Sequence, residues 1–104
     1  MEVSVTQSTP GNAPERVLAA GRAVSHEMAL DVLGIAIVCY TVLIEQEERR
    51  STPDADRLAQ WEGQIGVIAR LRHTLDSYDT DQIHRVTEEY ADLVRKLDKM
   101  IEDR

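Results

Sequence analysis

The amino-acid sequence predicts an all-α fold, most simply an antiparallel three-helix bundle with one long first helix. Apolar residues recur at three- and four-residue intervals in three segments, and prolines and capping residues separate these segments. None of the three segments shows the alternation typical of strands. We expect helices over residues 14–49, 53–76 and 80–102, a flexible tail over 1–13, and one helical-bundle domain over 14–104.

The first helix should begin at Pro14, which suits a first helical turn, and Glu15 favours the positive end of the helix dipole. No strong helix breaker follows until residues 51–53. The expected helix exceeds each of the other two by about 12 residues, a third of its own length. Either it breaks near Gly21 or Gly34, or one of its ends projects from the bundle.

Residues 32–44 of this helix contain no charged side chain, and apolar residues cover every face. One face can pack inside the bundle, and the other would leave an exposed apolar patch of the kind that marks an interface. We expect a partner-binding patch made of Leu33, Ile37, Tyr40 and Ile44. Two alternatives stay open. A further short helix would cover the second face, or the segment would cross a membrane, for which the uncharged run is shorter than the ~20 residues required.

The second helix has a clear start. Ser51 or Thr52 can cap it, Pro53 suits its first turn, and Asp54 matches the dipole. One apolar face follows, made of Leu58, Trp61, Ile65, Ile68, Leu71 and Leu75. Two glycines at residues 63 and 66 each cost roughly 1 kcal/mol of helix propensity. They indicate either that another helix approaches closely at this point or that the helix frays locally there.

The third helix follows a turn at residues 77–79, with Asp79 or Thr80 as its cap. Its apolar residues have the most regular helical spacing in the chain, and they are Ile83, Val86, Tyr90, Leu93, Leu97 and Met100. The second and third helices have similar lengths, so we expect them to pack along one another.

The charge balance excludes one class of partner. Twelve Lys and Arg residues stand against 19 Asp and Glu residues, which gives a net charge of −7. A nucleic-acid binder needs clustered basic side chains to release counterions, so we expect no nucleic-acid partner. The single cysteine, Cys39, can form neither an internal disulfide nor a thiolate metal site, which favours a reducing cytoplasm. Residues 1–13 lack the segments of a secretory signal.

Two patterns bear on metal chemistry. Asp81 and His84 lie three residues apart, which puts two ligand types on one helix face, although Asp81 can equally complement the helix dipole. The tetrads Glu45-Gln-Glu-Glu48 and Glu89-Tyr-Ala-Asp92 resemble the ExxE and ExxD motifs of all-α nucleotide pyrophosphohydrolases of the MazG type. That resemblance implies that Glu45, Glu48, Glu89 and Asp92 would be Mg²⁺ ligands.

A second resemblance rests on Trp61-Glu62-Gly63 near the middle of an acidic helical chain. It is similar to the WXG100 family of secreted helical hairpins, which implies a motif placed in the turn between two long helices. Here the expected turn lies at residues 51–53 instead. The alternative is that Trp61 is a core residue.

The sequence as a whole favours a non-catalytic, acidic, helical interaction protein of the cytoplasm, with an antitoxin, immunity-type or adaptor role. Its partner would be another protein chain, either a second copy in a homodimer or a basic heterologous protein, with no membrane and no nucleic acid involved. We expect no catalytic residues, no metal and no cofactor. The alternative function is the Mg²⁺-dependent pyrophosphohydrolase of the MazG type.

Overall fold

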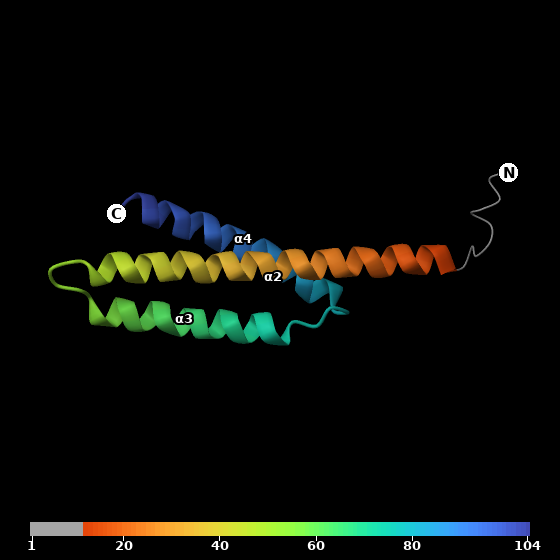
Figure 1. Cartoon of the computed structure of the whole chain (residues 1–104), viewed down its shortest axis with the longest axis horizontal. Coiled ribbons are helices and arrows are strands. Elements are labelled where there is room, and N and C mark those ends of the chain that lie inside the picture. The colour runs from red at the N-terminus through yellow and green to blue at the C-terminus, as the bar shows by residue number, and fades with distance from the viewer. Residues whose placement is uncertain (1–11) are drawn as a thin grey trace.

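The computed structural model describes residues 12–104 and contains three helices, α2 (Asn12–Glu48), α3 (Ala55–Thr74) and α4 (Thr80–Glu102). No strand occurs within these residues. The predicted all-α three-helix fold is therefore confirmed (Figure 1). The expected tail lies outside the described residues as far as residue 11, and its last two residues already belong to α2.

The long first helix is continuous. It spans 37 residues, which is about 55 Å at 1.5 Å per residue, and it does not break at Gly21 or Gly34. A single glycine costs only about 1 kcal/mol in a helix interior, which is too little to interrupt a helix of this length. Instead, one end of the helix projects from the bundle, which is the other possibility that the sequence raised.

The starts of the other two helices are set by aspartate caps. The Asp54 carboxylate accepts a hydrogen bond from the Arg57 backbone N–H at 3.1 Å, so α3 begins after Asp54. The sequence prediction of a cap at Ser51 or Thr52 was wrong, because the later aspartate takes that role. The Asp79 carboxylate accepts from the Gln82 N–H at 3.0 Å, which confirms Asp79 as the cap of α4.

Helix α2 is the centre of the arrangement. Both α3 and α4 pack against α2, whereas α3 and α4 make few direct contacts with each other. Figure 1 shows α4 crossing α2 at an angle, so that the later part of α4 lies on the opposite side of α2 from α3. The expected packing of the two shorter helices along one another does not occur.

The core reflects this central position. Half of its buried hydrophobic residues come from α2, and they are Ala29, Leu33, Ala36, Cys39, Tyr40 and Leu43. The others are Trp61, Ile68, Leu75, Ile83, Val86 and Leu97. Gly63 and Gly66 are not part of a close helix contact, since a Cβ atom built at either position meets nothing within 4 Å.

One end of α2 extends past the other helices. The His26 Nε2 atom lies 3.0 Å from the Leu75 carbonyl oxygen, and the Arg22 guanidinium lies 5.2 Å from the centre of the Tyr78 ring. These contacts bring the connection between α3 and α4 to the level of residues 22–26. The part of α2 before Arg22 therefore projects beyond α3 and α4 (Figure 1).

Helix α2 is also long and apolar enough to cross a membrane by length and composition alone. The central helix of a soluble helical protein satisfies the same criterion, so this is weak support for a membrane span. One side of α2 is covered by α3 and α4, as expected for a central helix.

The core assignment can be tested on α4. Leu97 is 3% exposed, so Leu97→Ala should lower the free energy of unfolding by about 2–5 kcal/mol through lost burial and a residual cavity. Lys99 is exposed on the same helix, and Lys99→Ala should change it by less than about 0.5 kcal/mol. Denaturant unfolding followed by circular dichroism measures both values. Equal effects of the two substitutions would contradict this placement of the core.

Candidate functional site

An apolar stripe runs along the side of α2 that faces away from the core. It follows alternating four- and three-residue steps and consists of Val17, Gly21, Val24, Met28, Asp31, Ile35 and Val38, which we call the outer stripe. All seven residues are exposed, and its five large apolar side chains keep 49–70% of their surface accessible. Nothing in residues 12–104 covers this surface. Aligned exposure of this kind is typical of a binding surface.

The four residues predicted to bind a partner lie on the other side of α2. Leu33 is completely buried and Tyr40 is 7% exposed. Ile37 and Ile44 are partly buried and pack against the core. The structure thus uses this face for contacts within the chain, and the apolar surface left exposed on the same helix is the outer stripe.

The outer stripe has an acidic character. Asp31 lies within it, and Glu27, four residues earlier, lies on the same side of the helix and is exposed. Neither carboxylate forms an ion pair with any residue that the structure describes. The guanidinium of Arg72, from α3, lies 3.9 Å from the position that a Cβ atom would take at Gly34, and its Nε donates to the Leu30 carbonyl oxygen at 3.2 Å.

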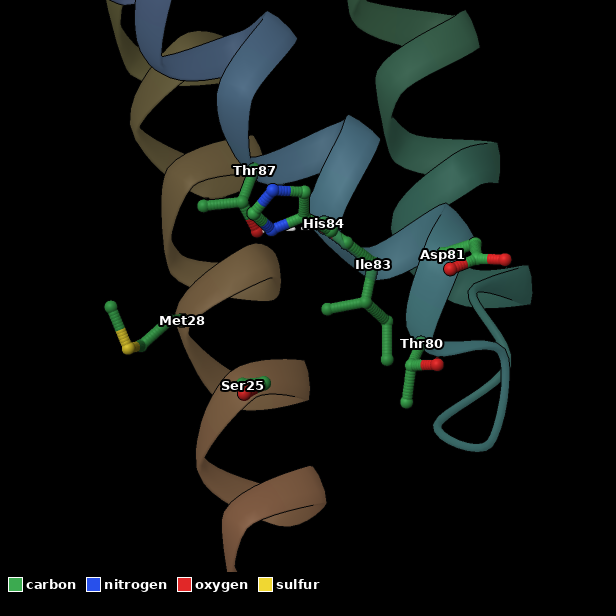
Figure 2. A pocket seen from close by; sticks show the side chains of 7 residues that line it. All are labelled: Ser25, Met28, Thr80, Asp81, Ile83, His84 and Thr87. Atoms are coloured by element: carbon green, nitrogen blue, oxygen red, sulfur yellow. Dashed lines mark hydrogen bonds between the residues drawn. The ribbon is translucent and has the colours of Figure 1, made fainter.

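A hollow of about 490 Å³ lies beside the outer stripe, between α2 and the first turns of α4. Figure 2 shows the side chains that line it, which are Ser25, Met28, Thr80, Asp81, Ile83, His84 and Thr87. Met28 belongs both to this hollow and to the outer stripe. The outer stripe and the hollow therefore form one continuous accessible surface at Met28.

The hollow does not hold a metal-ligand pair. In Figure 2 the Asp81 carboxylate and the His84 ring point apart, and His84 Nε2 lies 3.4 Å from Glu88 Oε2. Among residues 12–104, no group of three or more His, Cys, Asp or Glu side chains gathers closely enough to hold a metal ion. The spacing of Asp81 and His84 thus reflects the start of a helix.

The four carboxylates suggested by the MazG resemblance are likewise not brought together. All four are exposed, and Asp92 forms an ion pair with Arg95. Gln46 Nε2 donates to the Ile101 carbonyl oxygen at 3.4 Å, which sets the end of α2 level with the end of α4. Asp92 lies nine residues earlier in α4, about 14 Å along the axis. The two tetrads are therefore separated along the bundle.

A buried carboxylate joins the helices at the end of α2 that lies opposite the projecting part. Glu47 is fully buried. Its Oε2 accepts hydrogen bonds from the Asp54 backbone N–H at 2.9 Å and from Arg50 Nη1 at 3.0 Å. Its Oε1 accepts from Arg104, which follows α4, and lies 3.7 Å from Arg57 Nη1 of α3. The Glu47 side chain thus contacts the connection between α2 and α3, helix α3 itself, and the residues that follow α4.

These contacts lower the pKa of the Glu47 carboxyl from 4.5 to about 2. The hydrogen bond from the Asp54 N–H is the largest cause, followed by the hydrogen bond from Arg104. The positive charges of Arg50 and Arg104 act in the same direction, and burial opposes them. The carboxylate is consequently ionised at neutral pH.

Sequence reasoning did not single out Glu47, although a signal was present. Leu33, Ala36, Tyr40 and Leu43 follow a three- and four-residue spacing, and Glu47 is the next position on that buried face. A glutamate at a core position requires cationic and backbone partners. The nearby arginines at residues 49, 50 and 57 were the available candidates.

Trp61 belongs to the same end of the molecule. It is 6% exposed, and the guanidinium groups of Arg57 and Arg104 lie 5.7 and 5.6 Å from the centre of its ring. It lies inside α3 and not in a turn between helices, which is where the WXG100 resemblance would place it. The interpretation of Trp61 as a core residue agrees with this position.

Cys39 is 8% exposed in the core. Burial raises the pKa of its thiol, and the Asp98 carboxylate adds to this effect. A neutral buried thiol is a weak nucleophile, so Cys39 acts as a packing residue.

Comparison with known protein families, with curated proteins and with solved structures finds no match to this chain.

The separation of the carboxylates predicts the response to metal. Adding Mg²⁺ should leave the melting temperature of the wild-type chain unchanged, because the described residues offer no cluster of ligands. Asp92→Asn should respond in the same way. Thermal melts of both chains with and without Mg²⁺ provide the measurement. A rise of several degrees in the wild type that is lost in Asp92→Asn would instead favour the pyrophosphohydrolase.

Glu47 predicts a dependence of stability on acid. Its pKa is lower in the folded state than in the unfolded state, so the ionised carboxylate stabilises the fold above about pH 4.5 and this contribution is lost as the pH falls toward 2. Glu47→Gln should lower the melting temperature at neutral pH, and its difference from wild type should shrink across that window. Glu45→Gln, at an exposed position of the same helix, is the control and should change little. If the difference between the wild type and the Glu47→Gln variant stayed constant down to about pH 2, this role would be contradicted.

Proposed function

We propose that this chain is a non-catalytic helical interaction protein that binds another protein chain on the outer stripe of α2. The observation that carries the proposal is the exposure of Val17, Val24, Met28, Ile35 and Val38 along one side of a helix whose other side is buried. A side chain exposed alone needs no explanation, whereas an aligned row of apolar side chains on a small domain is typical of an interface.

The class of partner follows from charge and compartment. The net charge of −7 suits the occlusion of a basic protein by charge complementarity, which is how an antitoxin, an immunity protein or an adaptor acts. A chain with one buried thiol suits the reducing cytoplasm. No observation favours the pyrophosphohydrolase, since the carboxylates that it requires lie apart among the described residues.

The proposal predicts that Val38→Glu abolishes association while the chain stays folded. Val38 is 60% exposed, so a charge there reaches water in the free chain but is buried by a partner. Val67, which is 50% exposed on α3, provides a matched control, and Val67→Glu should leave association intact. Recovery of a stoichiometric partner from the native cell measures association for both variants, and circular dichroism of the purified chains measures their folding.

Ile37→Glu separates the two sides of α2. Ile37 packs against the core, so this change should lower the melting temperature of the chain itself. The opposite result would be a stable Ile37→Glu variant that no longer associates, together with a Val38→Glu variant that still does. In that case the interface would be the face of α2 that carries Ile37, and it would not be the outer stripe.

A further inference from the structure

We propose that the occupant of the outer stripe is an amphipathic helix of a different protein, with a pair of basic side chains, four residues apart, that face Glu27 and Asp31. This inference rests on the proposed function and specifies its partner. Two observations lead to it, the helical geometry of the stripe and the two carboxylates placed near its middle.

The geometry of the stripe fits a helix. Its four- and three-residue steps form a straight seam on α2, which is the arrangement that one helix presents to another. From Val17 to Val38 the seam extends for about 32 Å at 1.5 Å per residue. A partner helix of about six turns would cover it.

The charge pattern sets the chemistry of that helix. Asp31 lies between Met28 and Ile35, so a helix that covers these two side chains also removes water from the Asp31 carboxylate. A carboxylate that loses water without gaining a cation is destabilised. Glu27 lies one turn earlier on the same side. Because neither has an ion-pair partner among residues 12–104, the cations must come from the incoming helix.

The same charges disfavour a second copy of this chain. In a parallel pair, Asp31 would face its own copy. In an antiparallel pair centred on the stripe, the residues nearest the two-fold axis meet their copies, which brings either the two Asp31 or the two Glu27 side chains within about one helical turn of each other. Like charges at such positions exclude wrong partners.

The N-terminal residues of the chain do not supply the cations either. Residues 1–11 contain one charged side chain, Glu2, and no Lys or Arg. A segment of that composition cannot neutralise Glu27 and Asp31. The partner of stated chemistry is therefore a basic helix from elsewhere.

The test uses the full chain and two synthetic helical peptides of about 25 residues, the length that covers the stripe. Both carry leucines at three- and four-residue spacing. One has two lysines, four residues apart, at its centre, and the other has two glutamates there. Fluorescence anisotropy should show that the lysine peptide binds roughly tenfold more tightly or better, and that the difference shrinks as salt is added.

Two variants link this preference to the stripe. Asp31→Lys should remove the preference, because a cation then lies one helical turn from the Glu27 carboxylate, while Glu62→Lys, the same charge change at an exposed position of α3, should leave the preference unchanged. Asp31→Leu should weaken the preference, because only Glu27 remains to attract the lysines, and should shift the chain toward dimers in sedimentation experiments, because part of the repulsion between copies is lost. The wild-type chain should sediment as a monomer.

Three results would overturn the inference. Equal binding of the two peptides would show that the stripe does not select charge. A wild-type dimer that Val38→Glu dissociates would show that a second copy occupies the stripe, and the proposed function would survive. Binding to vesicles of neutral phosphatidylcholine that Val38→Glu abolishes would replace a protein partner by a membrane, and it would overturn the proposed function as well.

Discussion

The buried carboxylate of Glu47 is the constraint on which the arrangement of the helices depends. An isolated charge in a protein interior is strongly disfavoured, so Glu47 is accommodated only where a backbone N–H and several guanidinium groups converge on it. Those groups come from the connection between α2 and α3, from α3 itself and from the residues after α4. Because α3 and α4 touch each other little, this cluster links the far ends of two helices that otherwise meet mainly through α2. The cluster also fixes where the start of α3 and the end of α4 lie along the axis of α2. The length of α2 that neither helix covers follows from that position.

Helix α2 carries two apolar faces, and only one of them is satisfied within the described chain. Small and large residues alternate on the buried face, where Ala29, Leu33 and Ala36 let α3 and α4 approach. The outer stripe has similar spacing but includes Asp31 in place of a core residue. A carboxylate at that position keeps this part of the surface hydrated in the free chain. The structure therefore separates a face of α2 that packs within the chain from a face that remains in contact with water.

Local rules were sufficient to predict the number of helices, their type and most of their limits. Aspartates and prolines at helix starts and the three- and four-residue apolar spacing are local signals. Helix α4 has the most regular spacing, and it matched its expected range of 80–102. The face of α2 used by the core could not be assigned in the same way, because residues 32–44 are apolar all round and both faces satisfy the same pattern. The choice depends on where α3 and α4 lie in space. The burial of Glu47 could not be predicted locally either. Its partners Arg57 and Arg104 are distant in sequence, and they contact its carboxylate only in the folded chain.

The projecting part of α2 has a consequence for motion. Before Arg22 no other helix of the described chain covers α2, and large side chains such as Val17 and Leu18 are 70% and 63% exposed. An isolated helix of two to three turns is marginal in water, so backbone hydrogen bonds there open far more readily than those near Leu43. The molecule thus has a gradient of local stability along a single helix, rigid where Glu47 joins the elements and increasingly prone to fray toward Asn12. A partner that reaches this end would gain contacts only by ordering it, which lowers the affinity it could otherwise achieve and makes the encounter easier to reverse.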